Sequence, residues 1–132
     1  VRRVIVSEPI AAERGVDYAD AFELRLEEPE RRPPEVWVRA GIDATPAWIK
    51  RIAGAEEGLG SARVLESDAE VVVLEDSDAL MDTVMVGRNV DPQRRVLTTI
   101  LHYRRPLLAR VVWALVGILH RRTARQVVAG GR

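Results

Sequence analysis

The sequence predicts an α+β fold in which an antiparallel sheet packs against one long C-terminal helix. Strand patterning appears at residues 18–26 and in four further runs between residues 62 and 103, which are separated by short turns. A helical segment that begins at Pro106 contains an unbroken apolar run at residues 111–119. The length of 132 residues suits a single domain, with residues 1–16 as a peripheral N-terminal segment.

The first full strand of the expected sheet is residues 18–26. Phe22, Leu24 and Leu26 alternate there with charged residues, which is the period-2 pattern of a strand with one buried face. Ahead of it, residues 2–6 suit a short edge strand. The N-terminal segment is therefore expected at the periphery of the domain.

Two short helices are expected between this first strand and the second. Proline is tolerated at a helix start, so a helix is expected over residues 34–43, with Trp37 on its apolar face. Thr45, an N-cap residue ahead of a proline, begins a second helix that ends near Gly54 or Gly58.

Four strands are expected after these helices. Turn residues separate the runs and the links between them are short, so neighbouring strands should pair antiparallel as a meander. The expected strands are residues 62–67, 70–75, 80–90 and 95–103.

The last helix is expected to run from Pro106 to about Val128, ahead of Gly130. Arginines on both sides of the apolar run leave far fewer than the roughly 20 apolar residues of a membrane-spanning helix, so no transmembrane segment is expected. A helix that is apolar on nearly every side needs cover on nearly every side. One sheet face covers part of it, and the short helices, a ligand or a second copy of the chain are candidates for the rest.

A homodimer is the expected assembly. Residues 71–74 and 96–101 put aliphatic side chains on both faces of their strands, whereas a sheet gripped by one helix has an open face that is polar in a monomer. Two-fold pairing through the sheet or the helix would bury that apolar surface. Alternatively, the first seventeen residues and the short helices cover both faces within one chain.

Composition excludes several kinds of site. The chain has no cysteine, which excludes disulfides, thiolate-bound zinc and thiol catalysis. Residues 1–91 hold all 20 acidic and 11 of the 20 basic residues, a net charge of −9, and residues 92–132 hold the other nine basic ones, a net charge of +9. These parts either neutralise each other or present a basic surface to an anionic partner.

Aromatic residues make up 5% of the chain, too few for a base-stacking platform, so no nucleic-acid partner is expected. No signal peptide is recognisable at residues 1–6, and the cytoplasm is the expected location.

Four short segments, in this order along the chain, resemble a family of uncharacterised bacterial domains of the START-like (helix-grip, SRPBCC) superfamily. The segments are Asp17-Tyr18-Ala19-Asp20-Ala21-Phe22, Ser77-Asp78-Ala79-Leu80-Met81, Tyr103-Arg104-Arg105, and Trp113 with His120-Arg121. The resemblance implies a curved antiparallel sheet that grips the C-terminal helix, with two small helices between the first and second strands. Superfamily relatives often hold a hydrophobic ligand between helix and sheet, and some are cyclases or hydroxylase partners. Only four strands follow the helices here, which implies a smaller cavity or none.

No catalytic motif is present, and no catalytic residue, metal site or cofactor is expected. His102 and His120 have no nucleophile, metal motif or carboxylate pair beside them in the sequence. The alternative is a pair across a cavity mouth, or an acid–base histidine with Asp82 or Tyr103 nearby. The expected ligand-binding residues lie on the second short helix, the last two strands and one face of the last helix, and core packing is the alternative for most of them. They are Trp48, Thr83, Met85, Thr99, Tyr103, Trp113, Gly117 and His120.

Three functions follow from these observations. The first is a non-catalytic binding module for a small apolar or amphipathic molecule held between helix and sheet. The second is a structural or interaction protein that acts through a homo- or hetero-oligomeric interface. The third is a cyclase-like or hydratase-like enzyme, which requires a carboxylate, histidine or tyrosine with a perturbed pKa inside the cavity.

Overall fold

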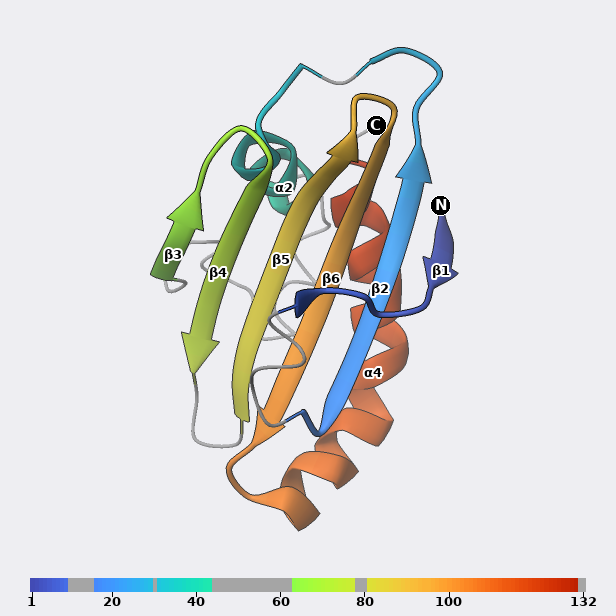
Figure 1. Ribbon diagram of the computed structural model, residues 1–132. Helices are drawn as coiled ribbons and strands as arrows, with labels where there is room; N and C mark the ends of the chain where they lie inside the picture. Colours follow the sequence, from blue (N-terminus) through green and yellow to red (C-terminus); the bar gives the residue numbers. More distant parts are fainter. Residues whose placement is uncertain (10–15, 30, 44–62, 78–80, 131–132) are drawn as a thin grey trace.

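The fold is an antiparallel six-stranded sheet with helices on one face (Figure 1). The computed structural model describes residues 1–9, 16–29, 31–43, 63–77 and 81–130. The strands, in the order β1-β2-β6-β5-β4-β3, pair antiparallel with each neighbour. The elements are β1 (Arg2–Val4), β2 (Tyr18–Arg25), α2 (Pro34–Asp43), β3 (Arg63–Ser67), β4 (Val71–Ser77), β5 (Met81–Asp91), β6 (Arg94–Tyr103) and α4 (Pro106–Val128).

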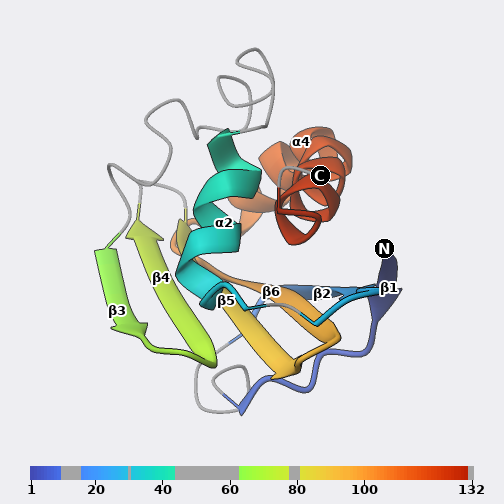
Figure 2. The same cartoon turned by 90° about the horizontal axis from the view of Figure 1, so that it is seen from above.

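The two helices lie on the same face of the sheet, and the segment after β1 crosses the opposite face (Figure 2). Helix α2 contacts β4 and β5, α4 contacts β2 and β6, and the two helices also contact each other. The long helix α4 therefore lies over β2 and β6, two neighbouring strands that come from opposite ends of the sequence.

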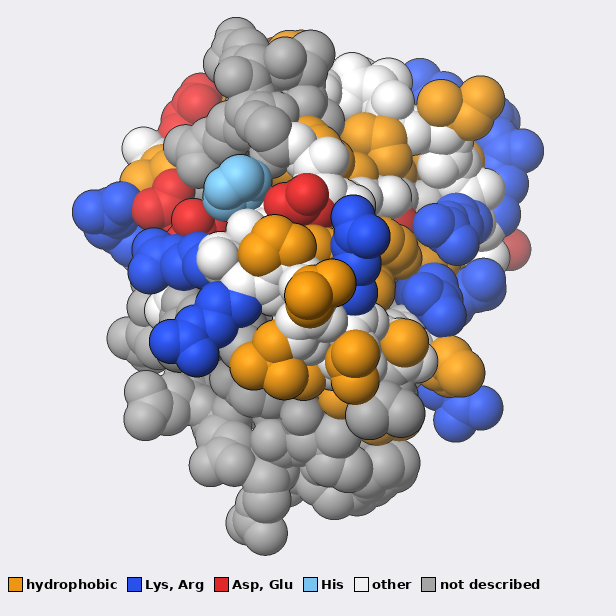
Figure 3. Space-filling model, turned by 90° about the horizontal axis from the view of Figure 1, so that it is seen from below, with side chains coloured by type: hydrophobic (Ala, Val, Ile, Leu, Met, Phe, Trp, Pro, Cys, Tyr) orange, Lys and Arg blue, Asp and Glu red, His pale blue; other side chains and the backbone are white. Residues whose placement is uncertain are grey.

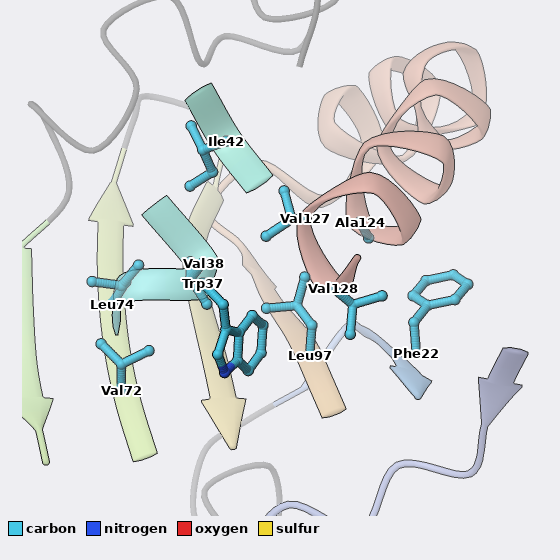
Figure 4. Packing of buried hydrophobic residues seen from close by; sticks show 10 residues of the cluster. All are labelled: Phe22, Trp37, Val38, Ile42, Val72, Leu74, Leu97, Ala124, Val127 and Val128. Carbon is cyan, nitrogen blue, oxygen red and sulfur yellow. The ribbon is translucent and has the colours of Figure 1, made fainter. Parts of the chain in front are cut away.

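The main core fills the space between the helices and the sheet (Figure 4). Trp37 of α2 and Phe22 of β2 are both 0% exposed, and Leu97 of β6 lies among them. Leu24 and Met85 pack against this core from the strands. Its members are Phe22, Trp37, Val38, Ile42, Val72, Leu74, Leu97, Ala124, Val127 and Val128.

A second apolar cluster lies on the opposite face of the sheet. Its buried members are Val71, Val73, Val84, Val86 and Ile100. Arg88 of β5 lies on this face too, two residues beyond Val86, and binds Glu8 of the N-terminal segment through two hydrogen bonds of 3.0 and 2.8 Å. Glu8 is itself buried, and its bond raises the pKa of Arg88. The segment after β1 is thus tied across the face that would otherwise be open.

Several elements agree with the sequence-based expectations. The structure confirms, within a few residues, both helices α2 and α4, the strand β2 and the four-strand meander β3-β4-β5-β6. The placement of the helices needs correction. Arg2 pairs with Glu23, so β1 is a strand of the sheet, and α2 lies between the second and third strands rather than between the first and second. One helix is described there instead of two, because the expected second helix falls on residues 44–62, outside the described residues.

The expectation of an open sheet face is also wrong in its premise. Val73 and Val86, on the face away from the helices, are 3% and 0% exposed within a single chain. These two side chains therefore offer no apolar surface to a second copy of the chain, which favours the alternative of cover within one chain. The homodimer itself stays a prediction.

Candidate functional site

Polar and aromatic side chains gather where α4 passes over β2 and β6. Strand β2 contributes Tyr18 and Asp20, and β6 contributes Thr99, the cross-strand partner of Asp20. Helix α4 contributes Trp113 and His120. We call these five residues the Asp20 cluster. They lie toward the start of β2, on the side of the sheet that faces the helix.

Asp20 is the central residue of this cluster, with a side chain that is 0% exposed. Its Oδ2 accepts a hydrogen bond of 2.8 Å from the hydroxyl of Tyr18. The Nε2 of His120 lies 3.4 Å from the same oxygen, a contact that becomes an ion pair when the imidazole is protonated. The other carboxylate oxygen, Oδ1, is buried and has no hydrogen-bond partner among the described residues.

Three more buried polar atoms of the cluster lack a hydrogen-bond partner in the described part of the chain. They are Oγ1 of Thr99, Nε1 of Trp113 and Nε2 of His120. Folded proteins pair almost all buried polar groups, because an unmade bond leaves the cost of desolvation uncompensated. Four such atoms in one place distinguish the Asp20 cluster from an ordinary packing contact.

The aromatic rings of the cluster contact one another in sequence. The ring centroids of Tyr18 and Trp113 are 4.9 Å apart, and those of Trp113 and His120 are 4.8 Å apart, both in tilted arrangements. Gly117 leaves room for the indole, since a Cβ there would lie 3.3 Å from Nε1 of Trp113. All three rings are partly exposed, so the cluster reaches from the buried carboxylate to the surface.

Burial raises the pKa of Tyr18, and the hydrogen bond to Asp20 raises it further, against a lowering contribution from Arg121. The guanidinium of Arg121 donates to the Tyr18 hydroxyl at 3.5 Å. Tyr18 therefore stays protonated at neutral pH and acts as a donor toward Asp20. The arrangement places a neutral phenol, a buried carboxylate and an imidazole within one set of contacts.

The structure brings several of the expected ligand-binding residues together, and their role in binding stays a prediction. Thr99, Trp113 and His120 lie together, and Gly117 lies against the indole of Trp113. Tyr103 is buried close by, in a small cluster with Leu101, Ala109, Tyr18 and Trp113.

Two other expected residues lie outside the cluster, and a third is not described. Met85 packs against the main core, and Thr83, also half-buried, lies two residues before it on β5. Trp48 falls on residues 44–62, outside the described residues.

Sequence reasoning missed Asp20 and Tyr18. The alternation that placed Phe22 and Leu24 on the buried face extends backward to Asp20 and Tyr18, and a carboxylate on an inward-facing position was the available signal. Each histidine also has a carboxylate beside it in the structure that is far from it in the sequence. Asp20 lies beside His120, and Oδ2 of Asp17 lies 3.4 Å from Nδ1 of the exposed His102.

A surface hollow of about 380 Å³ lies at the other end of β2. It is lined by Arg25, Leu26, Asp91, Gln93 and Arg94, and its walls are largely polar. It contains none of the expected ligand-binding residues. Among the described residues, no group of three or more histidines and carboxylates is arranged to hold a metal ion. Within the same residues, no helix is long and apolar enough to cross a membrane.

Comparison with known proteins leaves the geometry as the guide to function. No protein family, curated protein or solved structure matches this chain. The observations that bear on function are therefore the fold and the Asp20 cluster.

Proposed function

We propose that this chain is a START-like binding module that holds a small amphipathic molecule between α4 and the sheet, at the Asp20 cluster. The observation that carries the proposal is the buried carboxylate of Asp20, whose Oδ1 lacks a hydrogen-bond partner among the described residues. Thr99 Oγ1 and Trp113 Nε1, in the same cluster, lack one there as well. A ligand that supplied the missing hydrogen bonds would recover the cost of burying these groups.

The chemistry of the cluster selects the ligand's polar end. Asp20 Oδ1 only accepts, so it suits a hydroxyl, an amide N–H or, best of all, an ammonium group. The neighbouring faces of Tyr18 and Trp113 favour a cation as well. The apolar part of the ligand would lie against these rings and the small cluster around Leu101 and Ala109.

The edge of the sheet supplies a route to the cluster. Strand β1 pairs with Ala21, Phe22 and Glu23 of β2, so it stops short of Tyr18 and Asp20. Trp113 is partly exposed and forms the outer wall here. Rotation of the Trp113 side chain, which has two rotatable bonds, would open the buried carboxylate to a ligand.

Native mass spectrometry of the protein isolated from its own host tests this proposal. We expect a small molecule that co-purifies with the wild-type chain and is absent from the Asp20→Asn variant, provided that both show the same circular dichroism spectrum. A molecule retained equally by both would place binding elsewhere.

Acid–base catalysis is the second candidate function, because Tyr18, Asp20 and His120 converge and burial raises the pKa of Tyr18. A cyclase-like or hydratase-like reaction would use such a group of a proton donor and a base. The two candidates differ in one experiment. If the co-purifying molecule is returned to the protein, an enzyme converts it and His120→Gln stops the conversion, whereas a binding module releases it unchanged.

A further inference from the structure

The outward face of α4 carries an apolar stripe that the fold leaves in water. Leu107, Val111 and Ile118 are 83%, 60% and 59% exposed, and Ala114 between them is exposed as well. Their spacing of i, i+4, i+7 and i+11 places them along one side of the helix for three turns. Leu108 borders the stripe at 48% exposure. We call these five residues the α4 stripe.

Arginines surround the α4 stripe. Arg105 precedes the helix, Arg110 flanks the stripe, and Arg122 continues its line toward the C-terminus, all three of them exposed. In the view from the end where α4 begins, apolar side chains gather in the centre with basic side chains on both sides (Figure 3). The sequence from residue 92 to residue 132 contains no carboxylate side chain.

Carboxylates near the start of α4 are already engaged. Asp82 accepts a hydrogen bond from Nε of Arg104 at 2.9 Å, and Asp17 accepts one from the backbone N–H of Tyr103 at 2.6 Å. Arg105, Arg110 and Arg122, by contrast, make no ion pair with any residue that the structure describes. The stripe therefore has a positive rim whose charge is not neutralised in the described structure.

This combination decides between the possible occupants. A second copy of the chain docking by a two-fold axis would set the same patch against itself, and arginines would face arginines. A surface that is both apolar and anionic fits better, and an anionic lipid bilayer has both properties in one plane. Leucine, valine and isoleucine would enter the boundary of the acyl chains, while the arginine side chains would reach the headgroup phosphates.

We propose that α4 docks on anionic membrane surfaces through the α4 stripe and its arginine rim. The site is separate from the Asp20 cluster, since it uses the opposite side of the helix, and the inference goes beyond the proposed ligand binding. It describes a helix that lies in the interface plane without crossing the bilayer.

Co-sedimentation with vesicles tests the inference. One set of vesicles contains phosphatidylcholine alone, and the other contains phosphatidylcholine with phosphatidylglycerol at about three parts to one. We expect the protein to sediment with the anionic vesicles at low salt, with binding weakened about tenfold or more between about 0.05 M and about 0.5 M salt. No binding to the anionic vesicles at low salt, or equal binding to both sets, would overturn the inference.

Paired variants separate the two contributions. We expect Leu107→Gln with Val111→Gln, and separately Arg105→Gln with Arg110→Gln, each to weaken binding by about tenfold or more. Matched controls are Val36→Gln with Val64→Gln, which are exposed on α2 and β3, and Arg31→Gln with Arg63→Gln. Because every replaced side chain is exposed, melting temperatures should stay close to wild type, which shows that the variants fold. Equal losses in the test and control pairs would contradict the assignment to α4.

Two further measurements complete the design. Sedimentation equilibrium without vesicles should give the same mass for the wild type and for the double variant Leu107→Gln with Val111→Gln. A wild-type dimer that this variant dissociates would make the α4 stripe an interface between two copies of the chain and overturn the inference. Asp20→Asn should leave vesicle binding unchanged, so failure of the ligand-binding proposal and failure of this one are distinguishable.

Discussion

Arg95 at the start of β6 donates a hydrogen bond from Nε to the backbone carbonyl of Val128, the last residue of α4, at 2.8 Å. The side chain is 0% exposed, and its guanidinium lies 4.9 Å from the ring centroid of Trp37. A helix end carries carbonyl groups without partners inside the helix, so a buried cation there stabilises both the terminus and its position on the sheet.

Replacement of Arg95 by alanine should therefore be costly. We expect Arg95→Ala to lower the free energy of unfolding by about 2–4 kcal/mol, through the lost hydrogen bond and the cavity left beside Trp37. Urea denaturation measures the loss. Arg63→Ala, at a surface ion pair with Glu75, is the control and should cost less than about 1 kcal/mol. Equal losses for the two variants would show that Arg95 does not anchor α4.

The described tryptophans should differ in their contribution to stability. Sequence patterning alone places Trp113 in the core, where Trp113→Ala would cost about 3–5 kcal/mol. In the structure Trp37 is 0% exposed whereas Trp113 is half-buried. We expect Trp37→Ala to cost about 3–5 kcal/mol and Trp113→Ala about 1–2 kcal/mol by chemical denaturation. A larger loss for Trp113 than for Trp37 would contradict this assignment.

The contact between the helices depends on Gly41. A Cβ at this position of α2 would overlap the backbone of Val127 in α4, which cannot move as a side-chain tip can. We expect Gly41→Ala to destabilise the fold by about 1–3 kcal/mol despite the better helix propensity of alanine. Gly117→Ala is the matched change within α4, where the nearest atoms belong to the side chains of Trp113 and Arg121. It should be neutral or stabilise by up to about 1 kcal/mol, and the same loss at both glycines would refute the close helix crossing.

Both tyrosines of the chain should titrate late. Burial is the main cause that raises the pKa of Tyr18 and also that of Tyr103, where the carboxylate of Asp17 adds to it. The folded state favours the neutral form of both tyrosines. The stability that the neutral side chains contribute is therefore present below about pH 10, the pKa of tyrosine in the unfolded chain, and is lost as the pH rises through the higher pKa values of the folded protein.

Phenolate absorbance measures this titration directly. We expect less than half of the full absorbance change at about pH 10 in the folded protein, and half of it at that pH after unfolding in urea. The chain has two tyrosines, so Tyr18→Phe should remove half of the total change and identify which one titrates later. A folded protein that already shows the half-way absorbance at the unfolded pKa would contradict the burial of both rings.

Local patterns were sufficient to predict most of the elements. The bounds of α4 follow from Pro106 and from the glycine that ends it, since Gly130 has a φ of 65° that favours glycine. Alternating residues and short turns were enough for the meander of β3 to β6. These features depend on residues that are close together in the sequence, so the sequence pattern alone was enough to predict them.

Contacts between residues far apart in the sequence could not be predicted in the same way. The pairing of β2 with β6 brings Asp20 against Thr99, and α4 then brings His120 to the same carboxylate, although 100 positions separate the two residues. Nothing in the local pattern around either residue specifies that contact. The cover of the second sheet face by the segment of Glu8 was equally hidden, because it depends on an ion pair between the buried Glu8 and the partly exposed Arg88, 80 positions away in the sequence.

A binding titration with ligands that differ only in the polar end tests the central claim, that the buried carboxylate of Asp20 receives the polar group of a small amphipathic molecule. Isothermal titration calorimetry with hexylamine, hexanol and hexanoate keeps the apolar part constant. We expect hexylamine to bind most tightly and Asp20→Asn to weaken its binding by about tenfold or more, the cost of losing one charge-assisted hydrogen bond. Asp76→Asn, at an exposed carboxylate on β4, should leave the affinity unchanged. Hexylamine that binds no more tightly than hexanoate, or equally well to wild type and Asp20→Asn, would contradict the claim.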